Sequence, residues 1–296
     1  MTPRGALMPL ITIDHERCRK DGLCVSICQK IFTQESPNTV PVVSNEGFCN
    51  SCGHCVLICP SGAITQVNCP TGNVHQVRNE LLPTYEQMRE LIISRRSTRT
   101  FQDKPVDKAI IEKIINGASF APSAKNAQST EYVVVEDKAL LHALAERTAF
   151  CLGKSADQLR NPIWRRLYLM MGKVDTEQLA RWTGQFSLIA KRMTEGADLI
   201  LFNAPALILF HGDSRIAFAE ANANLAFQNA SMIASSLNIG HFYTGYMVAA
   251  WGRDKEMRKL LNLPARHRLY AGLALGHPKI RFSKWIDRNP AKVEWR

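Results

Sequence analysis

The sequence of 296 residues predicts an α+β protein made of a small cysteine-bearing module and a larger domain of helices and strands. Seven of the nine cysteines lie between positions 18 and 59. Beyond position 83, stretches with apolar residues at helical spacing alternate with short apolar runs typical of strands. We therefore place the module at 1–72, a polar linker at 73–82 and the larger domain at 83–296.

The expected elements follow from residue periodicity and from the residues that cap helices. In the module, strands are expected at 9–13 and 63–67. Thr84 and Gln87 form a capping-box pattern that begins a helix at 85–94. The other expected helices lie at 108–118, 138–147 and 216–237 and within 152–196, and the other expected strands at 131–135, 206–210, 242–247 and 268–275.

The clustered cysteines form two related runs. The first has the spacing C-x5-C-x3-C from Cys18 to Cys28, and the second has C-x2-C-x2-C-x3-C-P from Cys49 to Pro60. A shift of 31 residues superposes the runs, except that Asp21 stands in the first where the second has a cysteine. The second run resembles the pattern of two-cluster bacterial ferredoxins, in which the fourth cysteine of a run binds the other cluster. The resemblance covers roughly the first 70 residues.

This resemblance implies two iron–sulfur clusters with crossed ligands. Cluster I would take Cys18, Cys24 and Cys59 with Asp21 at the remaining iron, and cluster II, a [4Fe-4S] cluster, would take Cys28, Cys49, Cys52 and Cys55. Because iron–sulfur sites prefer thiolate to a hard oxygen donor, cluster I is either [4Fe-4S] with carboxylate or water on one iron, or [3Fe-4S]. Structural zinc is disfavoured, since it uses separated cysteine pairs and closes at four ligands. The remaining Cys69 and Cys151 are expected to be inert thiols.

Two segments of the larger domain carry a second signal. The stretch R-R-S-T-R-T-F at 95–101 offers guanidinium groups, which form forked, charge-assisted hydrogen bonds to phosphate, although a solvated basic surface is the alternative. The stretch A-P-S-A-K-N-A-Q at 121–128 brings small and amide side chains between a helix and a strand. Together with segments at 226–245 and 276–293, these stretches resemble the nitroreductase family of flavin enzymes over residues 83–296.

The nitroreductase resemblance implies a sandwich with a central, mainly antiparallel sheet flanked by helices, and an FMN at the interface of a homodimer. Matching the family's motifs position by position implies a set of cofactor-binding residues in this sequence. They are Arg95, Arg96, Ser97, Arg99, Pro122, Ser123, Asn126, Gln128, Thr244, Gly245 and Arg288.

The same resemblance implies roles for these residues. The arginines and Ser97 would hold the phosphate and ribityl chain, with Arg281 competing with Arg288 as the late phosphate-binding arginine. Pro122 and Ser123 would place a backbone N–H near flavin N5, and Gly245 would donate to the pyrimidine carbonyl. The amides at 126 and 128 would meet ribityl or ring-edge atoms.

The region 152–196 is expected to cover the substrate face. Its apolar residues would either line a pocket or serve ordinary helix packing. The residues concerned are Trp164, Tyr168, Met170 and Met171.

Together, the two resemblances predict an iron–sulfur flavoprotein oxidoreductase. It would pass electrons from a low-potential donor through two clusters to FMN and on to a nitroaromatic or other electron-poor small molecule. No side chain is assigned as general acid, base or nucleophile. The alternative function is an electron-transfer or redox-sensing protein that uses the same cofactors with a protein partner.

The bulk properties exclude other classes of protein. The composition, with 46% hydrophobic and 21% charged residues, is that of an ordinary globular protein. The net charge of +11 is scattered and accompanies no nucleic-acid motif, so nucleic acid is not an expected partner. The longest apolar run, at 199–210, is too short to span a bilayer, and no signal peptide is recognised, so a cytoplasmic location is expected.

Overall fold

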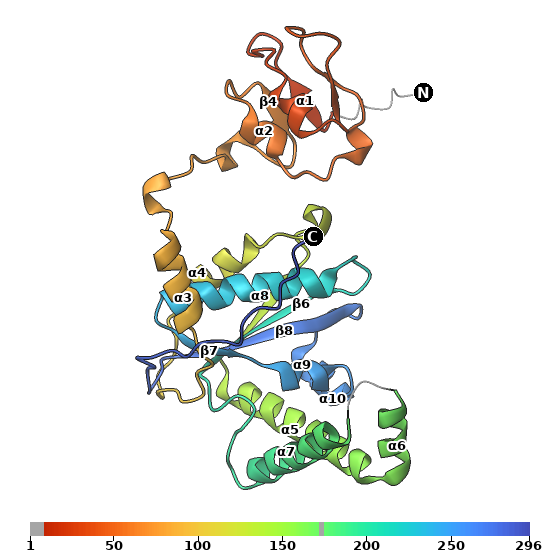
Figure 1. Cartoon of the computed structure of the whole chain (residues 1–296), viewed down its shortest axis with the longest axis vertical. Coiled ribbons are helices and arrows are strands. Elements are labelled where there is room, and N and C mark those ends of the chain that lie inside the picture. The colour runs from red at the N-terminus through yellow and green to blue at the C-terminus, as the bar shows by residue number, and fades with distance from the viewer. Residues whose placement is uncertain (1–8, 172–174) are drawn as a thin grey trace. The chain divides into compact units, whose positions relative to one another are not determined.

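The computed structural model describes residues 9–171 and 175–296 (Figure 1). The chain divides into two compact units. The first comprises the chain up to Leu82 together with Lys125–Ala127, and the second comprises Pro83–Ala124 and Gln128–Arg296.

The first unit, in its described part, contains two short antiparallel strand pairs and two short α-helices. β1 (Ile11–Ile13) pairs with β4 (Ile64–Gln66), and β2 (Phe32–Thr33) pairs with β3 (Val42–Val43). Helices α1 (Leu23–Ile27) and α2 (His54–Ile58) complete it, with 3-10 turns at Glu46–Phe48, Thr71–Asn73 and Asn79–Leu81.

The internal sequence repeat is also a structural repeat. The two helices of the first unit begin 31 positions apart, as the shift between the cysteine runs requires. Each follows a glycine in the left-handed conformation, Gly22 with φ 69° and Gly53 with φ 76°. A residue with a Cβ atom would be strained at both positions, which explains the glycine in each copy.

The second unit is organised around one four-stranded antiparallel sheet with the order β5-β6-β8-β7. Its strands are β5 (Glu131–Val135), β6 (Ala206–Asp213), β7 (Gly240–Tyr243) and β8 (His267–Gly276). The expectation of a mainly antiparallel sheet in an α+β sandwich is confirmed.

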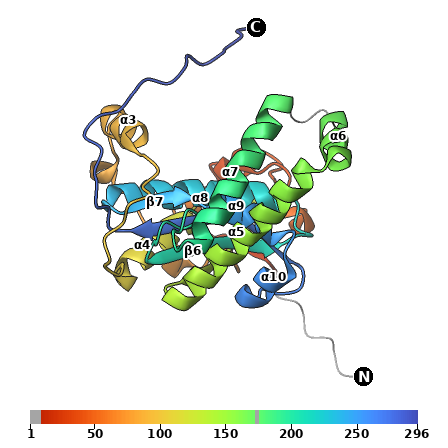
Figure 2. The same cartoon turned by 90° about the horizontal axis from the view of Figure 1, so that it is seen from below.

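Helices cover both faces of this sheet because the central strands are buried on both sides. Along β6, Ala206, Ile208 and Phe210 belong to the core formed with α4 (Lys108–Ser119) and α8 (Ala219–Ser236). The alternate residues Leu207 and Leu209 belong to the core on the other face. That core includes α5 (Lys138–Arg160), α7 (Thr176–Thr194), α9 (Gly245–Trp251) and α10 (Lys255–Leu261). Figure 2 shows α5 and α7 packed side by side.

Helix α3 (Tyr85–Ser94) begins with the capping box that its sequence predicts. The Thr84 hydroxyl accepts a hydrogen bond from the Gln87 backbone N–H at 3.2 Å, and the Gln87 side chain accepts one from the Thr84 N–H at 2.9 Å. Despite these well-formed caps, none of the helix's ten residues is buried.

Two expected elements differ in the structure. The strand expected at 242–247 ends at Tyr243, because α9 begins at Gly245, where the Met247 and Val248 N–H groups bond to the Thr244 carbonyl at 3.1 Å and 3.2 Å. The helix expected at 138–147 continues to Arg160, where Asn161 ends it and caps α6 (Pro162–Met170). Helices of the described part are all too short or too polar to cross a bilayer.

Candidate functional site

The cysteines of the first unit lie in two groups. Burial, together with the charges of Cys18 and Cys59, raises the pKa of Cys24. These three side chains line one small cavity together with Asp21. The first group therefore combines two residues of the first cysteine run with the last residue of the second.

The second group is drawn from both runs in the same manner. Burial is the main cause that raises the pKa of Cys55 to about 11, and the charges of Cys49, Cys28 and Cys52 contribute. Cys28 comes from the first run and the other three come from the second. This is the grouping that a crossed ligand pattern requires.

Asp21 and Cys59, which line the cavity of the first group, both accept hydrogen bonds from backbone N–H groups. Asp21 accepts a bond from the Leu23 N–H at 3.2 Å at the start of α1. Although burial opposes the effect, hydrogen bonds from Ser61 and from backbone N–H groups including that of Ala63 lower the pKa of Cys59. The Ala63 N–H lies 3.3 Å from the Cys59 sulfur. Thiolate is the form that binds metal.

Cys69, which the sequence analysis set aside, lies beside the second cysteine group. Burial, followed by the charges of Cys52 and Cys49, raises its pKa. Its thiol donates to the Ser51 carbonyl at 3.6 Å, and a Cβ atom on Gly53 would lie 3.1 Å from its sulfur. The sequence signal that could have pointed to this placement is the position of Cys69, three residues after the end of β4. In the structure the chain folds back there, and Cys69 forms an isolated β-bridge with Gln66.

In the second unit, arginines gather at a surface hollow of about 190 Å³. Arg95, Arg96 and Arg281 line it with His241, and none of the described residues that line it is acidic. Burial, followed by the charges of Arg96 and Arg288, lowers the pKa of Arg95. Positive charge therefore accumulates here without a protein anion to balance it, which favours the binding of an anionic group.

Arg99 lines a different cavity from Arg95. Residues 97 and 98 run alongside β7, where the Thr98 N–H donates to the His241 carbonyl at 3.0 Å, and Arg99 then emerges beyond this extended segment. Its guanidinium carbon lies 5.7 Å from the ring centre of Phe202 and 5.8 Å from that of Phe242. These are cation–π distances.

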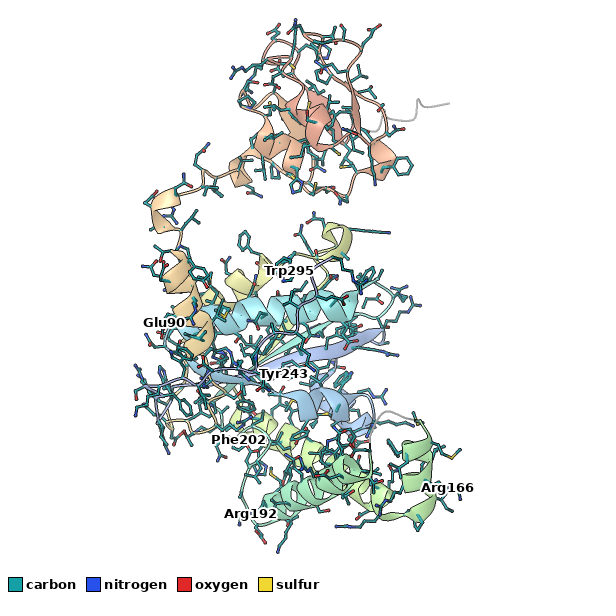
Figure 3. All side chains as sticks on the ribbon, viewed as in Figure 1. Glu90, Arg166, Arg192, Phe202, Tyr243 and Trp295 are labelled. Carbon is teal, nitrogen blue, oxygen red and sulfur yellow. The ribbon has the colours of Figure 1, made fainter. Side chains whose placement is uncertain are left out.

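The Arg99 cavity has a volume of about 300 Å³ and is lined by Thr244 and Gly245. It is also lined by Phe202 and Tyr243, which are labelled in Figure 3. A neighbouring cavity of about 640 Å³ shares Arg99 and Phe202. The hydroxyl of Thr244 is buried and has no hydrogen-bond partner among the described residues. Gly272 must lack a side chain, because a Cβ atom there would collide with this hydroxyl.

The loop at 121–128 borders a third hollow, of about 100 Å³, lined by Pro122, Ser123 and Gln128. The Asn222 side chain of α8 accepts a hydrogen bond from the Ala124 N–H at 3.0 Å. The Ser123 hydroxyl accepts one from the Gln128 N–H at 2.9 Å.

Asn126 is placed differently from the rest of this loop. It lies with the first unit, where its amide donates to the carbonyls of Asn50 at 3.3 Å and Ser51 at 2.9 Å.

The arginine hollow and the hollow bordered by the 121–128 loop lie against different parts of α8. Ser231 of α8 bonds His241 at 2.8 Å, whereas Asn222 holds the 121–128 loop. Nine residues separate these two side chains, about 14 Å along a helix that rises 1.5 Å per residue. A single chain therefore distributes most of the predicted cofactor residues over three hollows, whereas Ser97, Asn126 and Arg288 line none of these three.

His241 has a structural environment. It is 3% exposed, and its ring nitrogens lie 2.8 Å from the Ser231 hydroxyl and 3.0 Å from the Ile239 carbonyl. Burial lowers its pKa, so the imidazole is neutral at neutral pH.

Cys151 is an inert thiol, as expected from the sequence, because burial and a hydrogen bond to Asp254 raise its pKa to about 11.

Residues 164–171, which were expected either to line a pocket or to serve helix packing, line none of the cavities described above. Trp164, Met170 and Met171 are exposed, and α6 buries none of its residues. The region 152–196 contributes to the Arg99 cavity through α7 instead, with Gln185, Leu188 and Ile189. An amphipathic pattern alone cannot distinguish a helix that lines a cavity from one that faces solvent.

Comparison with known proteins identifies both units. The model of the nitroreductase family matches residues 92–277, more than half of the chain, and that of the 4Fe-4S binding domain matches residues 42–65. The chain belongs to the nitroreductase family. It is therefore an oxidoreductase that also carries a 4Fe-4S binding domain.

Three relatives illustrate this membership. A protein from Archaeoglobus fulgidus, provisionally named NADH dehydrogenase/NAD(P)H nitroreductase, is 25% identical over 216 residues, which are 70% of this chain and 97% of the relative. The FMN reductase [NAD(P)H] of Bacillus subtilis is 26% identical over 190 residues, covering 64% of this chain and 65% of the relative. The crystal structure of a nitroreductase with bound FMN from Bacteroides fragilis superposes with a TM-score of 0.53 and 19% identity over 71% of this chain and 99% of the other.

Proposed function

We propose that this protein is an iron–sulfur flavoprotein that carries electrons from a low-potential donor through two clusters to FMN, and reduces a nitroaromatic or other electron-poor compound. The observation that carries the proposal is the coexistence of two cysteine groups in one unit with an unbalanced arginine cluster in the other. When bound, FMN would accept electrons one at a time and deliver two to an organic substrate.

The cysteine groups fit iron–sulfur clusters in their chemistry. Each brings together at least three sulfur ligands, and the groups cross between the two runs as in two-cluster ferredoxins. Cys18, Cys24 and Cys59 would hold cluster I with Asp21, and Cys28, Cys49, Cys52 and Cys55 would hold cluster II.

The second unit fits a phosphate-bearing flavin. Arg95, with Arg96 and either Arg281 or Arg288, would neutralise the phosphate. Burial, followed by the positive charges of Arg96 and Arg288, lowers the pKa of Arg95, and a bound anion would offset both effects. The buried Thr244 hydroxyl, which has no hydrogen-bond partner within the described parts of the chain, offers a hydrogen bond to a polar ring edge, beside Gly245 at the start of α9. Pro122, Ser123 and Gln128 would contribute from their separate hollow.

The function is tested by anaerobic single-turnover oxidation of the fully reduced protein against a panel of nitroaromatics, quinones, enones and halogenated aromatics. Rapid reoxidation by one of these classes, saturable in its concentration, supports the enzyme. A protein that none of them reoxidises, and that only another redox protein reoxidises, would instead be the electron carrier.

We also propose that the protein is a homodimer, in which the three kinds of hollow, contributed by two chains, together form each flavin site. Tyr85, Met88 and Ile92 lie on one face of α3 and are 74%, 43% and 53% exposed. The C-terminal tail, which follows β8, also exposes two apolar side chains, Phe282 and Ile286. Exposed apolar surface of this kind is typical of an interface between chains.

Replacing Ile92 with aspartate is expected to weaken this dimer, because a charge would be buried at the interface. We expect the dimer dissociation constant to rise by about 30-fold, the effect of losing roughly 2 kcal/mol at a central contact. Sedimentation equilibrium measures it, with Glu90→Gln on the opposite, polar face of α3 as the matched control (Figure 3). A wild-type mass of one 33.2 kDa chain at all concentrations would contradict the dimer.

Replacing Asp21 with cysteine is expected to change the EPR spectrum of cluster I, since a fourth thiolate would complete its ligands. Any [3Fe-4S] signal should convert to a [4Fe-4S] signal, and a carboxylate-ligated [4Fe-4S] centre should shift its g values. Glu35→Cys, which adds an exposed thiol in the same unit, should leave the spectrum unchanged. An identical spectrum in Asp21→Cys and wild type would show that Asp21 is not at the iron.

A further inference from the structure

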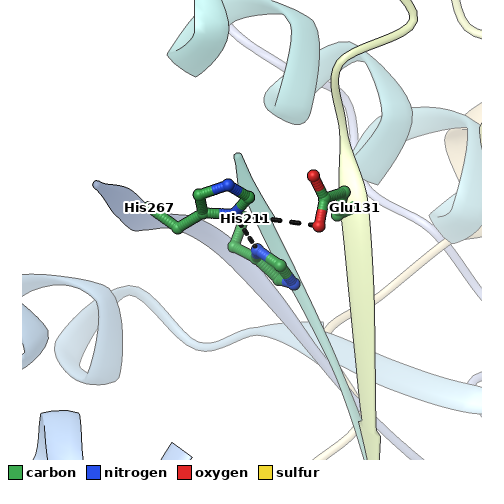
Figure 4. A group of neighbouring side chains, drawn as sticks. All are labelled: Glu131, His211 and His267. Atoms are coloured by element: carbon green, nitrogen blue, oxygen red, sulfur yellow. Dashed lines mark hydrogen bonds and ion pairs between the residues drawn. The ribbon is translucent and has the colours of Figure 1, made fainter. Parts of the chain in front are cut away.

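Three side chains of types that can bind a metal lie together at one end of the sheet of the second unit (Figure 4). Glu131, His211 and His267 each come from a different strand, and one ligand atom of each lies within 4.8 Å of the others. The Nδ1 atoms of the two histidines are 3.0 Å apart, and Nδ1 of His267 lies 3.8 Å from a carboxylate oxygen of Glu131.

The strand register explains why these side chains share a face. Glu131 pairs directly with His211 across β5 and β6, which places both side chains on the same side of the sheet. In β8 the register shifts, so that Phe210 pairs with Ala271 but His211 pairs with Leu269. The extra residue, Tyr270, reverses the alternation and turns His267 toward the face of His211. Without this bulge His267 would lie on the opposite face.

The distances suit a transition metal. Zn²⁺ bonds nitrogen and carboxylate oxygen at about 2.0–2.2 Å, so tetrahedral ligand atoms are separated by about 3.3 Å. The Nδ1–Nδ1 separation of 3.0 Å and the Nδ1–carboxylate separation of 3.8 Å lie on either side of this value. The Glu131 side chain, which is 59% exposed, can adjust, whereas His211 is 4% exposed and fixed in place.

The neighbouring charged side chains leave Glu131, His211 and His267 available as metal ligands. Asp213, opposite His267 in the strand pairing, is engaged by Arg215, whose Nε lies 3.1 Å and 3.0 Å from its two oxygens. The facing Nδ1 atoms are consistent with a hydrogen-bonded pair that a metal ion would replace.

We propose that Glu131, His211 and His267 bind a divalent transition-metal ion of the Zn²⁺ class, with a coordination position left for water. Two imidazoles and one carboxylate are a ligand set that such ions accept. The bound ion would tie three adjacent strands together at the end of the sheet.

The site is separate from the arginine hollow of the proposed flavin site. His267 begins β8, whereas Leu275, which pairs with His241 beside the arginine hollow, lies eight residues further along. This corresponds to about 26 Å at 3.3 Å per residue. Its test can therefore fail without affecting the proposed redox function, and the reverse also holds.

The experiment is anaerobic Zn²⁺ binding to the full-length protein with its clusters and flavin in place, measured by competition with a chromophoric chelator. Wild type is expected to bind one Zn²⁺ per chain at this site. Glu131→Gln and His267→Gln should each weaken that binding by at least about tenfold. His142→Gln, which alters an exposed His142–Glu146 pair on α5, is the matched control and should bind as wild type does.

A second measurement separates metal binding from a folding defect. Zn²⁺ should raise the melting temperature of wild type and of His142→Gln but not of the two site variants, all four retaining their cluster and flavin absorption. Equal Zn²⁺ affinity in wild type and both site variants would overturn the proposal, and so would the absence of Zn²⁺ binding by wild type. The histidines would then form a hydrogen-bonded pair only.

Discussion

Replacing Cys55 with serine is expected to abolish cluster II. Cys55 is 8% exposed and lies at the centre of the second cysteine group, with Cys49, Cys28 and Cys52 close enough to affect its pKa. A hydroxyl is a poor ligand for a soft iron–sulfur site. Iron and acid-labile sulfide per chain should fall by about half, and one of the two reduced-cluster EPR signals should disappear.

The matched control for this change is Cys151→Ser, which removes a thiol of the second unit that is held by Asp254. It should retain the full iron content and both EPR signals. Cys69→Ser is the more informative comparison, because Cys69 lies beside the same cysteine group without being an expected ligand. Unchanged iron content in Cys55→Ser would contradict the assignment of this residue to a cluster.

Replacing Arg95 with alanine is expected to weaken FMN binding about 10- to 150-fold. A hydrogen bond to a charged group contributes about 1.5–3 kcal/mol, and Arg95 is one of the three arginines that line the arginine hollow. Equilibrium titration of apoprotein with FMN, followed by flavin fluorescence, measures the change.

Arg181→Ala is the control for Arg95→Ala, because Arg181 is an exposed α7 residue paired with Glu177. Its loss should leave FMN affinity unchanged. Arg99→Ala adds a test of position, since Arg99 lines a different cavity and stacks near aromatic rings. Loss of affinity in Arg99→Ala but not in Arg95→Ala would place the phosphate elsewhere than in the arginine hollow.

Much of the fold was predictable because its signals are local. The capping box at Thr84 and Gln87, the β-branched run of β5 and the left-handed glycines before α1 and α2 each depend on neighbouring residues. The end of β7 was not predicted, because the expected strand at 242–247 contains the change from strand to helix, which occurs at Thr244.

The candidate site was predictable in its residue types but not in its arrangement. Motif spacing singled out Arg95 and Arg99, yet only the pairing of residues 97–98 with β7 sends these two side chains into different cavities. Cys69 and the group of Glu131, His211 and His267 carry no motif at all. Their neighbours come from distant strands, and the bulge at Tyr270 that turns His267 has no recognisable signature in the sequence.

The central claim is that electrons received by the iron–sulfur clusters reach the flavin of the same protein. Anaerobic stopped-flow reduction by a low-potential one-electron donor, followed at cluster and flavin wavelengths, tests it most directly. We expect flavin bleaching to follow cluster reduction in wild type and to fall to the background rate in Cys55→Ser. Flavin bleaching at the same rate in both proteins, or clusters that stay reduced beside an oxidised flavin, would contradict the claim.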